Sequence, residues 1–347
     1  MSLVDQPATY QAFRRSADGK AIQRTTEAMP RALGSKELLI KVNAVSLNYR
    51  DVAMLLGTYP VPCLDNGIPC SDASGTVVAT GSQVKTFKVG DAVSPIFHQL
   101  DTDKKEVNPG GEVDGVLREY LVCQEDHLVL NPAHLTDEEI STVPCAGVTA
   151  WTALNCDLPS KEVHSALLQG TGGVSMFALL ICLARGISPI ITSSSDEKLN
   201  AIAKLGQEGE IRTINYKTHS NYDVEVLRLT DNVGVDVVVN NVGITSIETS
   251  LRSLRRRGTI SLVGFLGGME VDAQPHIYEG ILLKSCTMRG IAVGSRQDHQ
   301  SLLRFLQERD VYLKTMIGKI FPFEQASDAF ELMMSGSNVG QIVIKIN

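Results

Sequence analysis

The chain has 347 residues, more than one ordinary hydrophobic core holds, so its length predicts two domains. It is 43% hydrophobic and 20% charged, which is the composition of a globular protein. The net charge of −7 and the absence of a long basic run argue against nucleic acid as a partner. The first residues lack the charged start and apolar run of a signal peptide, and no apolar run is long enough to span a membrane. We therefore expect a cytoplasmic protein with no membrane partner.

The first 127 residues contain short β-type runs broken by Gly and Pro. Runs typical of strands are residues 37–45, 74–81 and 118–123, and Gly90-Asp91 marks a turn between two more. This part of the chain predicts an irregular, mostly antiparallel β-domain.

Residues 128–311 alternate between strand and helix patterns. Strands are expected at 164–168, 187–194, 210–216, 235–243 and 259–268, with a last edge strand within 284–293. Helices are expected at 176–185, with Gly186 as C-cap, at 195–206, with Ser195 as N-cap, and at 221–230 and 246–258. The basic cluster "LRSLRRRG" is expected to be the solvated end of the last of these helices. This rhythm predicts an α/β domain with a doubly wound, parallel Rossmann sheet. Residues 312–347 are expected to pack back onto the first domain.

A glycine-rich loop follows the first strand of the parallel sheet. Gly170, Thr171, Gly172 and Gly173 form the turn, and a helix begins near Val174. Small residues let the backbone approach a pyrophosphate, and the helix N-terminus attracts its charge. Ser175 replaces the third glycine of the usual pattern, and serine is still a small residue. The alternative is an ordinary Gly-rich β–α turn.

The end of the second strand indicates which dinucleotide binds. A NAD site carries an acidic residue there, but this chain has Ser193 and Ser194. Lys198 lies one helical turn further on, and Tyr216 ends the third strand beside the same place. These residues favour NADPH. Alternatively, Lys198 is a solvated helix residue and Tyr216 covers the sheet edge.

Several motifs, in this order and spacing, cover nearly the whole chain: "VSLNYRD" (45–51), "GTYP" (57–60), "GTVVATGSQVKTFKVGDAV" (75–93), "DGVLREY" (114–120), "AGVTAW" (146–151), "QGTGGVS" (169–175) and "SSSDEK" (193–198). With them the chain resembles the medium-chain dehydrogenase/reductase superfamily. Within it, the chain is similar to the zinc-independent branch of quinone oxidoreductases and enoyl reductases, and to proteins called zinc-type alcohol dehydrogenase-like. The resemblance implies that the β-domain is a GroES-like catalytic domain.

Zinc-bearing members of the superfamily hold their catalytic metal with a Cys, a Gly-His-Glu segment and a second Cys. Here Asn48 stands near the first position, Ser71 and Asp72 replace His and Glu, and Cys145 alone matches. One thiol cannot form a three-ligand site. The segment that would carry the structural zinc, 98–118, has no cysteine. We therefore predict no metal, with Cys70 and Cys145 as core residues.

Without a metal, the resemblance implies hydride transfer from NADPH to an activated alkene or a quinone. It places Asn48 and Asp51 in the substrate–nicotinamide cleft and Tyr59 at its mouth, where a tyrosine can supply a proton. The alternatives are that Asn48 and Asp51 begin a helix, with Asn48 as N-cap, and that Tyr59 packs in a Tyr-Pro turn.

The resemblance also implies further cofactor contacts and an oligomeric state. The contacts carried over are Asn48, Thr149, Asn241, Val242, Val263, Gly264, Phe265, Val293, Ser295 and Asn338. The apolar edge strand around Cys286 and Met288 would be a liability if exposed, so we expect two chains to pair there as a homodimer. The alternative is an edge covered by the chain's own loops.

Two other functions compete with a metal-free reductase. One is an alcohol or aldehyde oxidoreductase, against which the missing zinc ligands count. The other, of a different class, is a non-catalytic NADPH-binding sensor or structural protein. A panel of alkenes, quinones and alcohols separates the three.

Overall fold

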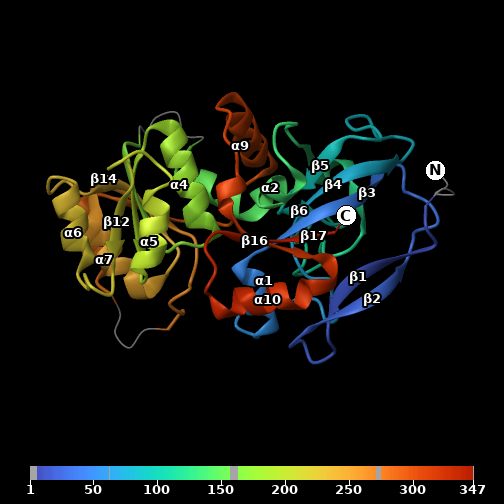
Figure 1. Ribbon diagram of the computed structural model, residues 1–347, viewed down its shortest axis with the longest axis horizontal. Helices are drawn as coiled ribbons and strands as arrows, with labels where there is room; N and C mark the ends of the chain where they lie inside the picture. Colours follow the sequence, from blue (N-terminus) through green and yellow to red (C-terminus); the bar gives the residue numbers. More distant parts are fainter. Residues whose placement is uncertain (1–5, 62, 157–162, 271–274, 347) are drawn as a thin grey trace. The chain divides into compact units, whose positions relative to one another are not determined.

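The computed structural model describes residues 6–61, 63–156, 163–270 and 275–346. The chain forms two compact units, Met1–Ala146 with Gly294–Asn347, and Gly147–Val293 (Figure 1). The sequence placed these boundaries at 127/128 and 311/312. They differ because helix α2 (Asp137–Ser141) packs on strands β3 (Glu37–Leu47) and β4 (Asp72–Thr80) of the first unit, and helix α9 (Arg296–Glu308) contacts strand β9 (Leu128–Leu130) there.

The first unit is built on a seven-stranded sheet, with the order β16-β17-β3-β4-β5-β9 and β8 also paired to β3. All pairs are antiparallel except β16–β17. The predicted return of the tail is confirmed, since Ile342 of β17 lies opposite Leu47 of β3. The remaining elements of this unit are β1 (Thr9–Arg15), β2 (Ile22–Ala28), β5 (Ala92–Pro95), β6 (Gln99–Leu100), β7 (Glu106–Val107), β8 (Tyr120–Gln124), β16 (Ile317–Pro322), β17 (Gln341–Lys345), α1 (Tyr49–Leu55) and α10 (Ala326–Ser335).

The second unit is the predicted parallel sheet, six-stranded, with the order β12-β11-β10-β13-β14-β15. Its strands are β10 (Ser165–Gln169), β11 (Ser188–Ser193), β12 (Arg212–Asn215), β13 (Val235–Asn240), β14 (Leu254–Leu262) and β15 (Thr287–Gly290), and its helices α3 (Val148–Ala153), α4 (Gly173–Arg185), α5 (Asp196–Ala203), α6 (Tyr222–Leu229), α7 (Ile247–Ser253) and α8 (Ile277–Lys284). The strand order reverses between β10 and β13. Ligands of such sheets bind beyond the carboxyl ends of the strands at this reversal.

One expected helix is shorter than its sequence pattern. The pattern over 246–258 predicted a helix, but α7 ends at Ser253 and β14 begins at Leu254. The prediction that the basic cluster is a solvated helix end was therefore wrong. Leu254 is fully buried opposite Val235 in the ladder, and Arg255 pairs with the carboxylate of Asp236. Strand pairing and a counter-charge outweigh the helix propensity of the segment.

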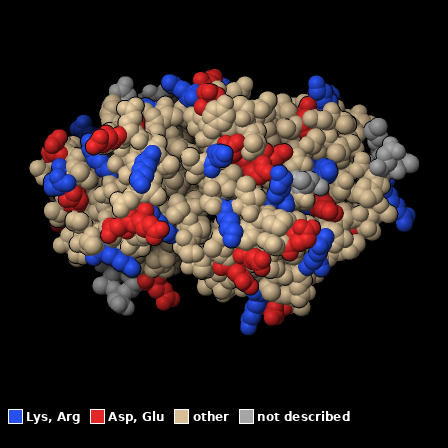
Figure 2. All heavy atoms as spheres, in the orientation of Figure 1, with Lys and Arg blue, Asp and Glu red and all other residues tan. Residues whose placement is uncertain are grey.

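The surface charges are mixed in sign. Figure 2 shows Lys and Arg side chains interspersed with Asp and Glu on the visible face. Across the described ranges, no helix combines the length and the apolar character needed to cross a bilayer.

Candidate functional site

The glycine loop has the shape of an anion cradle. Gly170 adopts φ +82°, a left-handed conformation that favours glycine, and Gly172 precedes α4 in an extended conformation. A Cβ added at either glycine would meet no heavy atom of the described residues within 4 Å, so the space above the loop is open. In the same part of the chain, no side chain caps the start of α4. The first N–H groups of this 13-residue helix can therefore bind a phosphate.

Ser175 takes the place of the third glycine of the loop and forms hydrogen bonds there. Its side chain is buried, and its hydroxyl donates to the backbone oxygen of Gln169 over 2.8 Å. The Asn241 amide nitrogen donates to the same hydroxyl over 2.9 Å, and to the Gln169 oxygen over 3.1 Å. The serine therefore ties α4 to the ends of β10 and β13. The Asn241 side chain, which the sequence predicted to contact the cofactor, is thus hydrogen-bonded to other residues of the protein.

A buried polar network, which the sequence reasoning missed, lies below the loop. The Gln169 amide nitrogen donates to the hydroxyls of Tyr222 (3.1 Å) and Ser250 (3.0 Å). The Asn240 amide also donates to Ser250 (3.0 Å) and accepts the N–H of Gly243 (2.7 Å). Burial raises the pKa of Tyr222 to about 12, against the lowering effect of the Gln169 hydrogen bond. The network fixes where β10 and β13 end, and its only sequence signal is polar residues directly after apolar strands.

The residues predicted to choose the cofactor gather at the ends of β11 and β12. The Ser193 hydroxyl accepts the N–H of Ser195, and the Ser193 carbonyl accepts the N–H of Tyr216 over 3.0 Å. Ser195 caps α5 by accepting the Lys198 N–H over 3.3 Å, as the sequence predicted. Ser194 and the Lys198 side chain are half-buried, and Tyr216 is exposed.

Two acidic residues, Asp196 and Glu197, begin α5 directly after this turn, and both are exposed. Asp196 is exposed, and one of its oxygens accepts a hydrogen bond from the Asn215 side chain over 2.8 Å. That bond holds the carboxylate toward β12. The groups of the turn that can bind a 2′-phosphate are therefore the hydroxyls and Lys198, with two carboxylates in the following helical turn.

The predicted contacts at the nicotinamide side lie in both units. In the second unit, Thr149 is buried on α3, and Val293 adopts φ +55°, which is rare for a β-branched residue. The Thr152 hydroxyl donates to the Val293 carbonyl and helps to hold that conformation. In the first unit, Ser295 caps α9 through Asp298.

Backbone contacts join the loops after β13 and β14. Val263 donates to the Asn240 carbonyl over 2.8 Å, and a Cβ at Gly264 would lie 2.7 Å from the Asn241 carbonyl oxygen. Val242 accepts the N–H of Gly267 over 2.8 Å. The structure thus brings together the two predicted strand-end segments, which also include Phe265. In the first unit, Asn338 donates to the Gly340 carbonyl over 2.9 Å.

The catalytic candidates Asn48 and Asp51 begin helix α1 in the first unit. Asn48 is the N-cap, and its backbone N–H donates to an Asp51 oxygen over 2.8 Å. The helix-start alternative is therefore confirmed, although it does not exclude a second role. Asp51 is fully buried, with its other oxygen 3.8 Å from the Arg50 guanidinium. Burial raises the pKa of Asp51, and the charge of Arg50 opposes that shift.

Asp72, the Ser71 hydroxyl and the Cys145 backbone N–H form a hydrogen-bonded group, here called the Asp72 unit. It lies at positions that correspond to the zinc ligands of zinc-bearing relatives. One Asp72 oxygen accepts the Ser71 hydroxyl over 2.6 Å, and the other accepts the backbone N–H of Cys145 over 2.7 Å. Asp72 and Ser71 are both 0% exposed. Burial raises the pKa of Asp72 to about 7, against the lowering effect of the Ser71 hydrogen bond. Within the described residues, no group of three or more His, Cys, Asp and Glu side chains could hold a metal ion.

Cys70 precedes this pair in a conformation that favours glycine. Its φ is +71°, and it stands where the zinc-bearing relatives have the glycine of their Gly-His-Glu segment. The side chain is fully buried, and burial raises the pKa of its thiol well above the usual range. Its carbonyl accepts the N–H of Val116 over 2.9 Å.

Tyr59 lies against a buried cation. The Arg50 guanidinium is 5.6 Å from the centre of the Tyr59 ring and 4.9 Å from that of Phe97, and it donates to the Pro109 carbonyl over 2.9 Å. Arg50 is only 7% exposed. Arg50, which the sequence reasoning missed, therefore joins Tyr59 to Asp51 within one unit.

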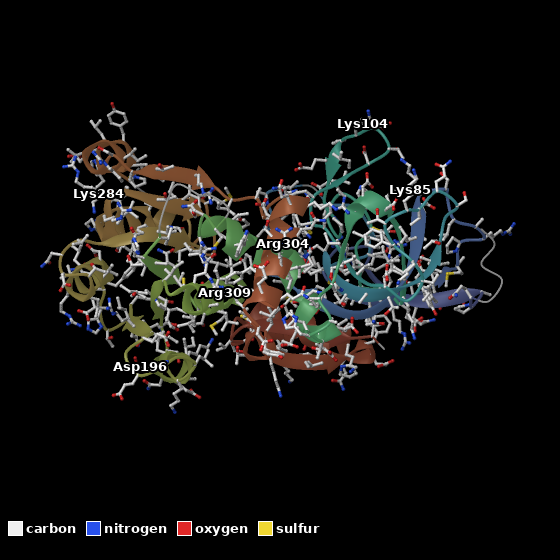
Figure 3. All side chains as sticks on the ribbon, turned by 90° about the horizontal axis from the view of Figure 1, so that it is seen from above. Lys85, Lys104, Asp196, Lys284, Arg304 and Arg309 are labelled. Carbon is white, nitrogen blue, oxygen red and sulfur yellow. The ribbon has the colours of Figure 1, made fainter. Side chains whose placement is uncertain are left out.

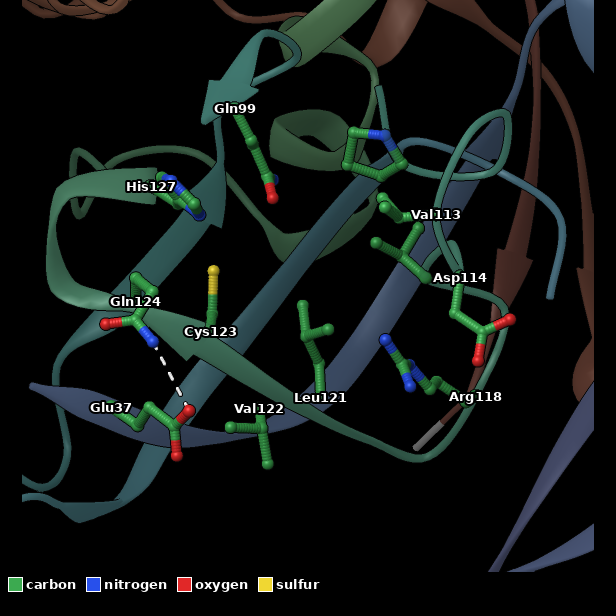
Figure 4. A pocket seen from close by; sticks show the side chains of 12 residues that line it. Glu37, Gln99, Val113, Asp114, Arg118, Leu121, Val122, Cys123, Gln124 and His127 are labelled. Atoms are coloured by element: carbon green, nitrogen blue, oxygen red, sulfur yellow. Dashed lines mark hydrogen bonds between the residues drawn. The ribbon is translucent and has the colours of Figure 1, made fainter. Parts of the chain in front are cut away.

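A cavity of about 240 Å³ lies elsewhere in the first unit, between strand β8 and the 99–114 segment (Figure 4). Its acidic groups already have partners. Glu37 accepts hydrogen bonds from Gln124 and from the backbone of Gly34, and Asp114 pairs with Arg14 over 3.1 Å. The two carboxylates therefore offer a ligand little unmatched charge.

Comparison with known proteins identifies the family. Residues 34–133 match the alcohol dehydrogenase GroES-like domain, and residues 173–308 match the zinc-binding dehydrogenase domain. A zinc-type alcohol dehydrogenase-like protein of Schizosaccharomyces pombe is 35% identical over 328 residues, covering 92% of this chain and 93% of the relative. A quinone oxidoreductase of Pseudomonas aeruginosa is 32% identical over 252 residues, covering 72% of this chain and 71% of the relative.

A solved structure of a putative alcohol dehydrogenase from Sinorhizobium meliloti superposes with a TM-score of 0.87 and 31% identity, over 98% of this chain and 100% of the other. The fold, the glycine loop and these similarities agree. The chain therefore belongs to the medium-chain dehydrogenase/reductase superfamily, as an oxidoreductase of the zinc-type alcohol dehydrogenase-like group.

Proposed function

We propose that this oxidoreductase uses NADPH to reduce an activated alkene or a quinone, without a metal ion. The observation that carries the proposal is the Asp72 unit. At the positions of a catalytic zinc, both carboxylate oxygens already accept hydrogen bonds from Ser71 and Cys145. An amide, a hydroxyl, an engaged carboxylate and one thiol do not make a three-ligand zinc site. The residues present therefore do not fit a zinc ion.

The residues of the second unit do fit a dinucleotide phosphate. Gly170, Gly172 and the N–H groups at the start of α4 would bind the pyrophosphate, with Ser175 holding the helix in place. Ser193, Ser194 and Lys198 would bind the 2′-phosphate, since hydroxyls and an ammonium group suit a phosphate dianion. When bound, NADPH supplies the hydride for reduction.

Two groups of the first unit support the supply of a proton to the reduced substrate. Tyr59 remains our proposed donor, and its ring packs against the buried Arg50 guanidinium, 5.6 Å from the ring centre. Burial raises the pKa of Asp72 to about 7, so this carboxyl holds its proton to a higher pH than an exposed aspartic acid does. Asn48 and Asp51 would orient helix α1, which precedes Tyr59 in the chain.

Two other functions remain distinguishable by experiment. The name of the S. pombe relative favours an alcohol or aldehyde oxidoreductase, and a non-catalytic NADPH-binding protein would keep the loop without turnover. NADPH oxidation should be followed with an enone, a quinone and an aldehyde, each with and without a chelator. Turnover of the enone or quinone that the chelator does not change supports the proposal. Turnover of the aldehyde alone, dependence on added zinc, or binding without turnover each contradicts it.

We also propose that the protein is a homodimer joined at the β15 edge of the second unit. Strand β15 ends the sheet, and none of the described residues of α8, which precedes it, is buried. Tyr278, Leu282 and Leu283 of that helix are 81%, 63% and 65% exposed. A second copy that covers this apolar surface would also pair the open strand edge.

A further inference from the structure

A groove of about 390 Å³ opens on the first unit beside α9. Its volume lies within the range of sites that take small organic ligands. Within the described part of the chain, no Asp or Glu lines it. The lining residues are Thr86, Phe87, Val129, Leu130, Asn131, Pro132, Arg296, Gln300, Leu303, Arg304 and Gln307.

One face of α9 supplies the polar wall. Arg296, Gln300, Arg304 and Gln307 are spaced by four, four and three residues, which places them on the same face of the helix. The two arginines are eight residues apart, so their Cα atoms are about 12 Å apart along the helix axis. Two cations and two amides at this spacing suit an elongated anion better than a single small ion.

The two guanidinium groups are not neutralised by carboxylates. One Arg296 nitrogen donates to the Leu128 carbonyl over 2.9 Å, while its Nε is buried without a hydrogen-bond partner among the described residues. Arg304 is exposed and makes no ion pair with any residue that the structure describes (Figure 3). The nearby carboxylate of Glu125 accepts the backbone N–H groups of Lys85 and Thr86 instead. The groove thus has a local positive charge on a chain of net charge −7.

The lining residues outside α9 form a second, mostly apolar wall. Phe87 and Val129 in it are buried, Leu130 at the end of β9 is 52% exposed, and Thr86 and Asn131 are polar. An exposed leucine beside a buried apolar floor offers a contact surface to a flat ring. The two walls together therefore match a molecule with a charged chain and a planar, weakly polar end.

We propose that this groove binds a nucleoside polyphosphate, with its phosphates at Arg296 and Arg304 and its base on Leu130. Arginine binds phosphate oxygens through paired N–H donors, which an anionic chain can accept at both positions. All the lining residues belong to the first unit, whereas the glycine loop belongs to the second. The groove and the proposed cofactor loop therefore share no residue.

The test is calorimetric titration of ATP into the full-length protein. The titration is made with saturating NADP⁺ and repeated with the Gly172→Asp protein, whose added carboxylate would repel phosphate from the glycine loop. We expect one ATP per chain in both cases. Binding that disappears in either case belongs to the loop and overturns the proposal, while the separate titration of NADPH into both proteins tests the cofactor assignment.

Matched variants then locate the ATP. Arg304→Glu should weaken ATP binding about tenfold or more, because it replaces an attraction by a repulsion. Arg309→Glu, with the same charge change just beyond the end of α9, should leave it unchanged. Both side chains are exposed, so the fold should survive, and circular dichroism checks this. Equal affinities of the two variants would overturn the proposal.

The ring contact has its own test. Inorganic tripolyphosphate carries the charge of ATP without the base, so we expect it to bind more weakly than ATP. Leu130→Ser should reduce the affinity for ATP toward that of tripolyphosphate and leave tripolyphosphate unaffected. If tripolyphosphate binds the natural protein as tightly as ATP, the nucleotide assignment is wrong.

Discussion

Asp72→Asn should change how the stability of the first unit depends on pH. The Asp72 carboxyl is fully buried, and its pKa in the folded protein is about 7, against 3.8 in the unfolded chain. Below about pH 4 both states carry the proton, and the group has no effect on stability. As the pH rises through 4 to 7, the unfolded chain loses the proton while the folded protein keeps it, so the free energy of unfolding falls. Above the folded pKa the loss is complete.

The size of the effect follows from the shift. A difference of about 3 pH units corresponds to about 4 kcal/mol, and the asparagine variant cannot titrate. The variant also loses a hydrogen bond. Both Asp72 oxygens accept, from the Ser71 hydroxyl and the Cys145 N–H, whereas an asparagine amide has only one accepting oxygen. That loss is the same at every pH. The stability of the variant relative to the natural protein should therefore rise by up to about 4 kcal/mol between pH 4 and pH 8.

The assay is urea unfolding at several pH values, followed by far-ultraviolet circular dichroism. Fluorescence would report the wrong unit, because the one tryptophan, Trp151, lies in the second. Asp137→Asn, at a half-buried helix start in the same unit, is a control for the loss of one charge. A stability difference between variant and natural protein that stays constant from pH 4 to pH 8 would refute the claim that the buried Asp72 carboxyl keeps its proton up to about pH 7.

Three further predictions concern the cofactor, the proton donor and the assembly. Lys198→Ala should weaken NADPH binding about tenfold by calorimetry and leave NADH binding unchanged, because only NADPH carries the extra phosphate; an equal loss for both cofactors would contradict this. Tyr59→Phe should slow enone reduction about 10²-fold at unchanged NADPH affinity, and a loss of only a few-fold would mean that solvent supplies the proton. Leu283→Lys should convert a dimer into a monomer near 37.6 kDa by light scattering. A natural protein already of that mass would rule the dimer out.

The local signals in the sequence predicted most of the second unit. The run of β-branched residues before Asn240, the Ser195 cap and Gly186 at the end of α4 each reflect neighbouring residues only, and each agrees with the structure. The helix expected over 246–258 ends early because β14 begins at Leu254, which pairs with Val235 outside the segment. Such pairing has no signature in the segment itself.

The site was predictable only in part, for the same reason. The glycine loop is one continuous segment, so its role could be inferred from its spacing. The contacts of Asp72 with Cys145, and of Arg50 with Tyr59 and Phe97, join residues separated by 9 to 73 positions. Nothing in any of these short segments indicates the partner. The motif positions could show that zinc ligands were missing, but not which bonds replaced them.

The most direct test of the account is deuterium transfer by the metal-free protein. The protein is treated with a chelator, checked for zinc by elemental analysis and mixed with an enone and NADPH that carries deuterium at the transferred position. The account predicts a saturated ketone with one deuterium at the former β-carbon, formed at the same rate before and after chelation. An unlabelled product, no NADPH-dependent reduction, or a rate restored only by added zinc would contradict it.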